Sequence, residues 1–437
     1  GDANTAVGRD ALVSNTTASN NTAVGKDSLK ANTTGAVNTA IGSQALFSNT
    51  TGCCNVAIGG DTMYTNSTGC YNVAIGKNTL EANTTANNNT AVGFSAMAAN
   101  TTGYINVAVG RDAMKANTTG QGNVGIGGYA LDANTTGSRN IAIGCSALSA
   151  NTTCSDNIAI GFCALTTQTN GGINNTSIGN YSMKLNTTGD NNVAVGYNAL
   201  NENTTGMLNT AVGAIALEDQ TTGGCNTALG YAALCTVTTG TDNVGIGIQA
   251  GDSVTTGATG TYVGGYSGQS VTSGNGTYIG KNAGYNATTG INNVAVGLSA
   301  GNDIFNITDH SNRIVLSNNS ATNAYIKIDW TVTSDKRDKT EIENVPHGLD
   351  FVNQLKPVSF KFKKSRENSI AHGLKKYGFL AQDILELEGD NNVIIDNENE
   401  ENLKVTNSHL IPVLVNAIKE LKAENDSLKT RIEALES

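Results

Sequence analysis

A serine and a lysine stand five residues apart in the stretch VTSDKRDKTEI, residues 332–342. A serine hydroxyl becomes an effective nucleophile only when a base takes its proton, and a lysine can be that base if burial or neighbouring cations lower its pKa. Ser334 and Lys339 therefore form a candidate Ser-Lys dyad, a variant of the serine triad. The spacing alone is weak support, because a serine among charged residues is usually part of a solvated turn.

The composition of the 437-residue chain changes at the same stretch. Residues from 334 onward hold 34 of the 62 charged side chains, 15 basic plus 19 acidic, and all three prolines, Pro346, Pro357 and Pro412. The preceding residues are poor in charge and contain no proline. This shift predicts a domain boundary near residue 334.

Before the boundary the chain is a tandem repeat with the template N-[TVI]-A-[VI]-G-x-x-A-[LM]-x-x-N-T-T-G-x-x, a period of 17 broken by one step of 18 and one of 16. Its short alternating apolar segments and Asn-Thr-Thr-Gly turns predict about two small strands and two turns per repeat. So short a unit cannot bury its own apolar face, so it must stack as one rung of a β-solenoid or β-roll. The 18 repeat glycines are Gly8, Gly25, Gly42, Gly59, Gly76, Gly93, Gly110, Gly127, Gly144, Gly161, Gly179, Gly196, Gly213, Gly230, Gly247, Gly264, Gly280 and Gly297.

Repeated positions predict how the rungs stack. Sixteen of the 18 repeats keep an asparagine four residues before the glycine, and stacked amides of this kind can form ladders. Ten repeats contain Asn-Thr-Thr, from Asn15 to Asn203, which is formally a glycosylation sequon, although a turn-and-ladder role is favoured. In the last four repeats the Leu or Met position is glycine, so either the cross-section of the solenoid narrows there or a partner chain comes close to its axis. Because each rung has so small an apolar core, we favour three chains that share one interior. Those glycines are Gly251, Gly268, Gly284 and Gly301.

The composition argues against several classes of function. A net charge of −10 gives no footprint for nucleic acid, and no apolar run is long enough to insert in a membrane. All eight cysteines lie in the repeats without metal-type pairs, so neither a metal nor a cofactor is expected. Cys53 and Cys70 occupy the same place in adjacent repeats, which allows a rung-to-rung contact, although variable loop cysteines are the alternative. The chain begins within a repeat, so we expect a fragment or processed form.

Residues 302–333 depart from the period and predict a β neck, with strands in RIVLSNN (313–319) and AYIKIDWTVTS (324–334). The C-terminal end predicts a helix over about 408–436 with a coiled-coil seam, in which one polar a residue fixes the register. A helix packed on its own domain is the alternative, and Ile at a with Leu at d nominally favours dimers. The seam has a positions Ile411, Ile418, Asn425 and Ile432, and d positions Leu414, Leu421, Leu428 and Leu435.

The C-terminal region resembles the endosialidase-type intramolecular chaperone domain found at the ends of phage tailspikes and tail fibres. Ser334 and Lys339 fall in a stretch that resembles its SDxRxK opening, where Asp335 and Arg337 also match. GLDFVNQLKPVSFKF (348–362) resembles its first conserved strand region, and YGFLAQDI (377–384) its GFIAQEV motif. LKVTNSHLIPVLVNAIKELKAEN (403–425) resembles the segment leading into its terminal helix, with His409 departing from an expected aromatic-x-x-Leu pattern.

This resemblance implies a single-turnover autoprotease that acts on its own chain and has no external substrate. Its domain would trimerise the preceding fibre, after which Ser334 would attack the Thr333–Ser334 bond with Lys339 as base. Some members of the family are not cleaved, so an intact dyad does not by itself imply cleavage.

The repeats resemble the head repeats of trimeric autotransporter adhesins, whose unit is shorter, and still more the NTTG-bearing repeats of phage tail fibres. We therefore expect a mostly β fold: a trimeric β-solenoid over 1–301, the neck over 302–333, and an α+β chaperone domain over 334–437. The expected function is a homotrimeric virion tail fibre that attaches to a host cell-surface receptor, a glycan or envelope component. A bacterial trimeric surface adhesin is the alternative. A polysaccharide-degrading tailspike is less favoured, because no repeat shows the carboxylate cluster that a glycosidase needs.

Overall fold

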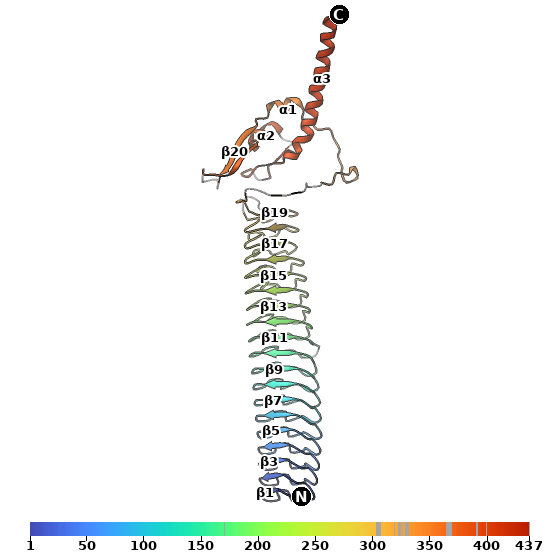
Figure 1. The fold of residues 1–437 in the computed structure, drawn as a ribbon, viewed down its shortest axis with the longest axis vertical. Coiled ribbons are helices and arrows are strands. Elements are labelled where there is room, and N and C mark those ends of the chain that lie inside the picture. Colours follow the sequence, from blue (N-terminus) through green and yellow to red (C-terminus); the bar gives the residue numbers. More distant parts are fainter. Residues whose placement is uncertain are drawn as a thin grey trace. The chain divides into compact units, whose positions relative to one another are not determined.

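The computed structural model describes residues 1–169, 171–302, 307–318, 320, 321, 325, 327, 332–363, 369–389, 392–398 and 400–436. The chain divides into two compact units, Gly1–Asn318 and Asn319–Ser437 (Figure 1). The first unit contains the repeats, and the second contains Ser334 and Lys339. Within the described residues, no helix combines the length and apolar character needed to span a membrane.

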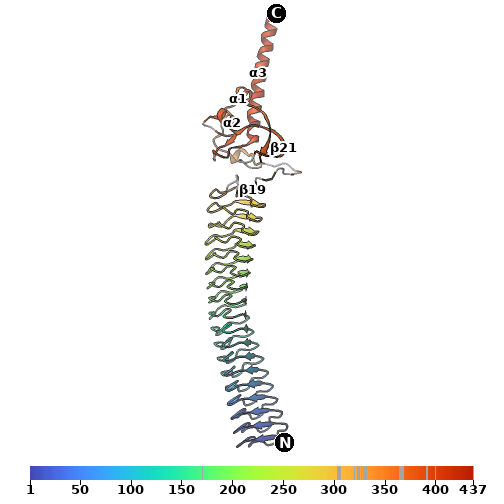
Figure 2. The same cartoon turned by 90° about the vertical axis from the view of Figure 1, so that its left-hand side faces the viewer.

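The first unit is a β-solenoid in which each repeat forms one rung (Figure 1, Figure 2). Each rung contributes one three-residue strand to a parallel sheet of 19 strands, and equivalent residues pair, as Ala142 does with Ala159. This confirms the expected solenoid of 17-residue rungs. The strands are β1 (Thr5–Val7), β2 (Thr22–Val24), β3 (Thr39–Ile41), β4 (Val56–Ile58), β5 (Val73–Ile75), β6 (Thr90–Val92), β7 (Val107–Val109), β8 (Val124–Ile126), β9 (Ile141–Ile143), β10 (Ile158–Ile160), β11 (Thr176–Ile178), β12 (Val193–Val195), β13 (Thr210–Val212), β14 (Thr227–Leu229), β15 (Val244–Ile246), β16 (Thr261–Val263), β17 (Thr277–Ile279), β18 (Val294–Val296) and β19 (Ile314–Leu316).

A rung contains one strand, whereas the repeat pattern predicted about two. The Ala-Leu part of the repeat is a turn, and its buried Leu or Met has positive φ, 56° at Leu131 and 51° at Met114. This left-handed conformation costs a non-glycine residue roughly 1–2 kcal/mol. Both side chains are completely buried, and burying a Leu or Met side chain contributes about 1.5–3 kcal/mol, which offsets that cost.

The sheet continues beyond the last repeat glycine. Strand β19 pairs in parallel with β18, so Ile314–Leu316, within the RIVLSNN segment, adds another rung and does not begin a separate neck. The solenoid unit accordingly ends at Asn318, later than the expected residue 301. The second neck strand, expected over 324–334, lies largely outside the described residues. Its described members Tyr325 and Lys327, with residues 332–334, are not in a strand.

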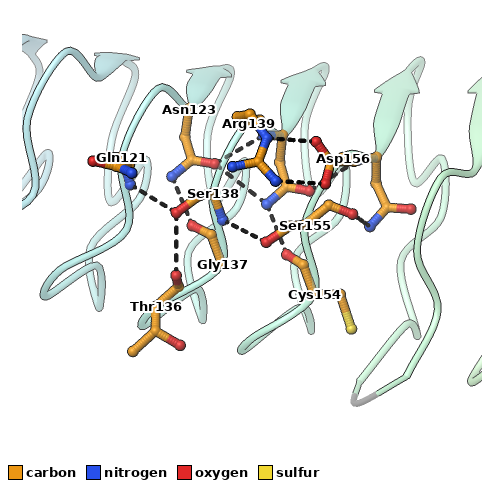
Figure 3. Close-up of polar contacts among 11 residues, drawn as sticks. Gln121, Asn123, Thr136, Gly137, Ser138, Arg139, Cys154, Ser155 and Asp156 are labelled. Atoms are coloured by element: carbon orange, nitrogen blue, oxygen red, sulfur yellow. Dashed lines mark hydrogen bonds and ion pairs between the residues drawn. The ribbon is translucent and has the colours of Figure 1, made fainter.

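Asparagine side chains connect successive rungs. The Asn123 Oδ1 atom accepts a hydrogen bond from the Asn140 backbone at 2.9 Å, and its Nδ2 donates to the Gly137 carbonyl at 2.8 Å (Figure 3). The Asn134 amide, from an Asn-Thr-Thr turn, donates to the same carbonyl at 3.0 Å and to Asn117 Oδ1 at 2.8 Å. These contacts satisfy buried polar groups, and they confirm the predicted ladders.

The Asn-Thr-Thr asparagines are therefore structural. Nine of the ten, from Asn32 to Asn203, are completely buried, and Asn15 in the first turn is half-buried. A glycan on a buried asparagine would displace the ladder contacts. The turn-and-ladder role thus accounts for the motif.

The rungs that lack Leu or Met fill their core in another way. The middle residue of β16 and β17 is tyrosine in place of the usual alanine, and Tyr262 and Tyr278 are completely buried and stacked, with ring centroids 5.9 Å apart. A Cβ atom on Gly251 or Gly268 would lie 2.7 or 2.3 Å from the Tyr262 ring. The tyrosines thus occupy the volume that Leu or Met fills elsewhere. The expected interior shared by three chains is wrong here, because this chain's own side chains fill it.

The outward face of the sheet is apolar along its length. The third residue of every strand is Val, Ile or Leu, and the first is Thr, Val or Ile. The exposed fraction is 39% at Ile41 and 47% at Leu229. No strand of this sheet places a charged side chain on that face. So extended an exposed apolar patch is typical of an interaction surface.

The second unit is a small α+β region with a long terminal helix. Its core contains Phe351, Ile384, Ile394, Leu410 and Val413. Strands β20 and β21 form one antiparallel pair, and β22 and β23 form another. The elements are η1 (Lys336–Asp338), α1 (Leu349–Gln354), β20 (Val358–Lys363), β21 (Ala371–Gly378), α2 (Ala381–Glu388), β22 (Ile395–Asp396), β23 (Lys404–Val405), η2 (Asn407–His409) and α3 (Leu410–Glu436).

Candidate active site

The candidate dyad lies on a short 3-10 turn, η1, that its own sequence stabilises. Asp335 caps the turn, its carboxylate accepting a hydrogen bond from the Arg337 backbone N–H at 2.9 Å. The Arg337 guanidinium contacts the same carboxylate, with Nη2 to Oδ2 at 2.6 Å. The Arg337 side chain, and then its backbone N–H, lower the pKa of Asp335, while this carboxylate raises the pKa of Arg337. Asp335 and Arg337 therefore hold the turn in shape.

The turn brings the two predicted reactive side chains together. Lys339 is the C-cap of η1, and its backbone N–H bonds to the Lys336 carbonyl. Its Nζ atom donates a hydrogen bond to Ser334 Oγ over 2.7 Å. This distance is within the range required for proton transfer between a base and its nucleophile.

The bond expected to break is on the surface of this chain. Thr333, Ser334 and Lys339 are all exposed. In this contact the lysine is the hydrogen-bond donor, and it could accept the serine proton only as an uncharged amine. The chain alone thus supplies the geometry of a dyad, but not the water-excluded surroundings that favour an uncharged lysine.

The predicted coiled-coil residues lie on α3, which begins and ends close to the expected 408–436. Ile418 is 66% exposed and Leu428 is 54% exposed. A different face of the helix packs on the domain, through Leu410, Val413 and Ala417. The seam is therefore not used for packing within the chain, whereas this other face packs on the domain as the alternative expected, so the coiled coil stays a prediction. All eight seam residues are exposed: Ile411, Leu414, Ile418, Leu421, Asn425, Leu428, Ile432 and Leu435.

Two polar anchors on α3 were not predicted. The Glu420 carboxylate accepts a hydrogen bond from the Leu349 backbone N–H at 2.6 Å, at the start of α1. The Asn416 amide donates to the Val345 carbonyl at 3.1 Å. They fix the first half of α3 against Val345 and the start of α1. Both residues stand between the seam positions of the heptad, and this placement is the feature of the sequence that could have identified them.

The buried carboxylate of Glu388 was also not predicted from the sequence. Glu388, at the end of α2, is 7% exposed and accepts backbone hydrogen bonds from Val393, Ile394 and Ile395 at 2.7–3.0 Å. His409, the departure from the expected pattern, donates from Nδ1 to the Val393 carbonyl at 2.7 Å. Both side chains fix the loop before β22 and are remote in sequence from the dyad. Within the described residues, no group of three or more His, Cys, Asp or Glu is placed to hold a metal ion.

One comparison with known proteins gives a match, and that match lies in the second unit. Residues 334–393 match the family model described as chaperone of endosialidase, and the match begins at Ser334. No curated protein and no solved structure matches the chain.

Proposed function

We propose that this chain is the shaft and assembly domain of a homotrimeric attachment fibre, a phage tail fibre, and that it cleaves itself at Thr333–Ser334. A β-solenoid followed by a chaperone-of-endosialidase domain fits a structural protein of the fibre or tailspike kind. The single observation that supports self-cleavage best is the 2.7 Å contact between Lys339 Nζ and Ser334 Oγ.

The proposed reaction uses atoms of this chain and one water molecule. Uncharged Lys339 takes the proton of Ser334 Oγ, which attacks the Thr333 carbonyl carbon through a five-membered ring. The Oγ–C bond forms, the C–N bond breaks, and Lys339 returns the proton to the Ser334 nitrogen. Water then hydrolyses the ester, leaving a carboxylate on Thr333 and restoring the hydroxyl. Assembly would activate the dyad, because covering the exposed Lys339 with other copies disfavours its charged form.

The test is the intact mass of the purified chain over time. The wild type should yield a fragment that begins at Ser334, and Ser334→Ala should remain whole. Lys339→Ala should slow cleavage about 10²–10⁴-fold, the usual contribution of a general base. Lys336→Ala is the matched control, because Lys336 is an exposed lysine of the same turn. This variant should cleave at the wild-type rate. Cleavage of Ser334→Ala at the wild-type rate would refute the assignment.

Two surfaces of the chain support assembly with copies of itself. The exposed heptad seam of α3 offers Ile and Leu at the spacing that parallel coiled coils use. The outward face of the solenoid repeats the same apolar row at each rung, so parallel copies present matching surfaces. Three copies remain our proposal, because the endosialidase-type domain that the chain resembles assembles trimeric fibres. The proposed receptor is a host glycan or envelope component.

A further inference from the structure

The solenoid contains a thiol pair that the proposed fibre function does not use. Cys53 and Cys70 each stand six residues before a repeat glycine, in successive rungs. The Cys53 Sγ atom donates to Cys70 Sγ at 2.9 Å, and the Tyr71 backbone donates to the Cys53 carbonyl at 3.1 Å. The two backbones are therefore at rung spacing, about 4.8 Å, which is within the range of Cα separations that disulfides span.

The same position in other rungs shows what a residue without redox chemistry does there. The Ser138 Oγ atom accepts a hydrogen bond from the Gln121 backbone at 3.2 Å, and Ser155 Oγ accepts one from the Ser138 backbone at 3.0 Å (Figure 3). Cys70 Sγ takes this role towards the Cys53 backbone, at 3.0 Å. Serine thus preserves the ladder contact, so Cys→Ser variants should leave this part of the solenoid folded.

We propose that Cys53 and Cys70 are a site of reversible disulfide formation that covalently joins two rungs. Both side chains are half-buried, so a small reagent can reach them. The cross-link would close a loop of one repeat and prevent these two rungs from separating. This inference rests on the solenoid alone and does not depend on the proposed self-cleavage.

The reaction needs a low-molecular-weight disulfide as oxidant, such as oxidised glutathione. One protein thiolate attacks that disulfide and releases one glutathione thiol; the other then attacks the resulting mixed disulfide and releases the second. Two protein thiols lose two protons and two electrons, and the reagent is reduced to two thiols. Contact with Cys70, and then burial, raises the pKa of Cys53 to about 12, so closure should be faster at higher pH, where more thiolate is present.

The test treats the full chain with oxidised glutathione, then denatures it and alkylates it with N-ethylmaleimide. Eight cysteines minus two in the disulfide should leave six alkylated sites per chain. Cleavage before Asp61 separates Cys54 from Cys70, so the cross-link should join the two resulting peptides. A reductant should restore all eight alkylation sites. Eight alkylated sites after oxidation, or a lasting mixed disulfide with glutathione, would overturn the proposal.

Serine variants identify the partner. Cys54 is next to Cys53, so Cys54→Ser should form the cross-link at the wild-type rate, whereas Cys53→Ser should form it at least ~10-fold more slowly. Cross-linking of Cys53→Ser at the wild-type rate would assign the bond to Cys54 and contradict the proposal. Cys145 and Cys163 are an internal control from neighbouring rungs, because Cys145 Sγ contacts Ser146 Oγ at 3.8 Å instead, and both should remain alkylated.

Discussion

Tyr262 shows how a single side chain controls a rung of the solenoid. Its ring fills the core, but its hydroxyl is buried without a hydrogen-bond partner, a situation that costs about 1–3 kcal/mol. Tyr262→Phe should therefore keep or raise the apparent Tm at neutral pH. Tyr262→Ala should lower the free energy of unfolding by about 3–5 kcal/mol, because it opens a cavity. Thermal unfolding followed by circular dichroism measures both changes.

The same variant predicts a pH dependence. Burial raises the pKa of Tyr262, whereas an unfolded tyrosine ionises near pH 10. The stability held by neutral Tyr262 is complete below about pH 10 and is lost as the pH rises towards the folded-state pKa. The wild type should therefore lose more stability than Tyr262→Phe between neutral pH and alkaline pH. Equal losses in the two proteins would contradict this assignment.

The sequence predicted the dyad better than it predicted the core. Ser334 and Lys339 are close in sequence, and Asp335 between them is a typical cap for a short turn, so their contact depends on local structure. Gly251 stands where other rungs have Leu or Met, and Tyr262 stands where most other rungs have Ala. These two positions belong to successive rungs and face each other only once the solenoid forms. Leucine at positive φ, as at Leu131, contradicts ordinary backbone preference and is stabilised by burial of its side chain and by a backbone hydrogen bond to the Ala147 carbonyl of the next rung.

The helix α3 has two faces with different surroundings. The face with Leu410, Val413 and Ala417 packs on the domain, and the exposed seam predicts association between copies. Leu428→Lys should reduce the assembled mass towards that of a single chain, because it places a charge in the seam. Ala423→Lys adds the same charge at an exposed position outside the seam and should leave the mass unchanged. Light scattering after size-exclusion chromatography distinguishes them, and equal masses for the two variants would exclude a coiled coil.

The type of other elements in the second unit could not be assigned from the sequence pattern. The segment 348–362 was expected to be a strand region, yet it begins with α1, Leu349–Gln354, and only then becomes β20. A short apolar run fits a helix or a strand equally well, and tertiary packing of Phe351 in the core decides between them. The end of α3 was predictable because its heptads give a long, regular signal.

At the scale of the whole molecule, repetition creates a problem of alignment. Each rung pairs with its neighbour in the same chain, and the residues that pair are one repeat apart, as Thr5 and Thr22 are. Copies that lie side by side present nearly the same apolar row at every rung. Two copies displaced by one rung therefore lose little contact, and such slips compete with correct assembly. In the proposed fibre, a domain at one end that joins the copies would set their offset, which gives the proposed assembly domain a role.

We predict a difference in refolding before and after removal of the proposed assembly domain. The shaft that ends at Thr333, produced by self-cleavage or by truncation, should remain assembled once formed but should recover poorly after unfolding in guanidinium chloride. The Ser334→Ala chain, which keeps its domain, should regain its assembled mass on dilution. Light scattering measures the recovered mass, and circular dichroism reports whether the rungs have reformed. Equal recovery of the assembled mass with and without the domain would mean that the copies align without it. Refolded shafts with the mass of a single chain would show that the domain aligns the copies and is not needed for the solenoid itself.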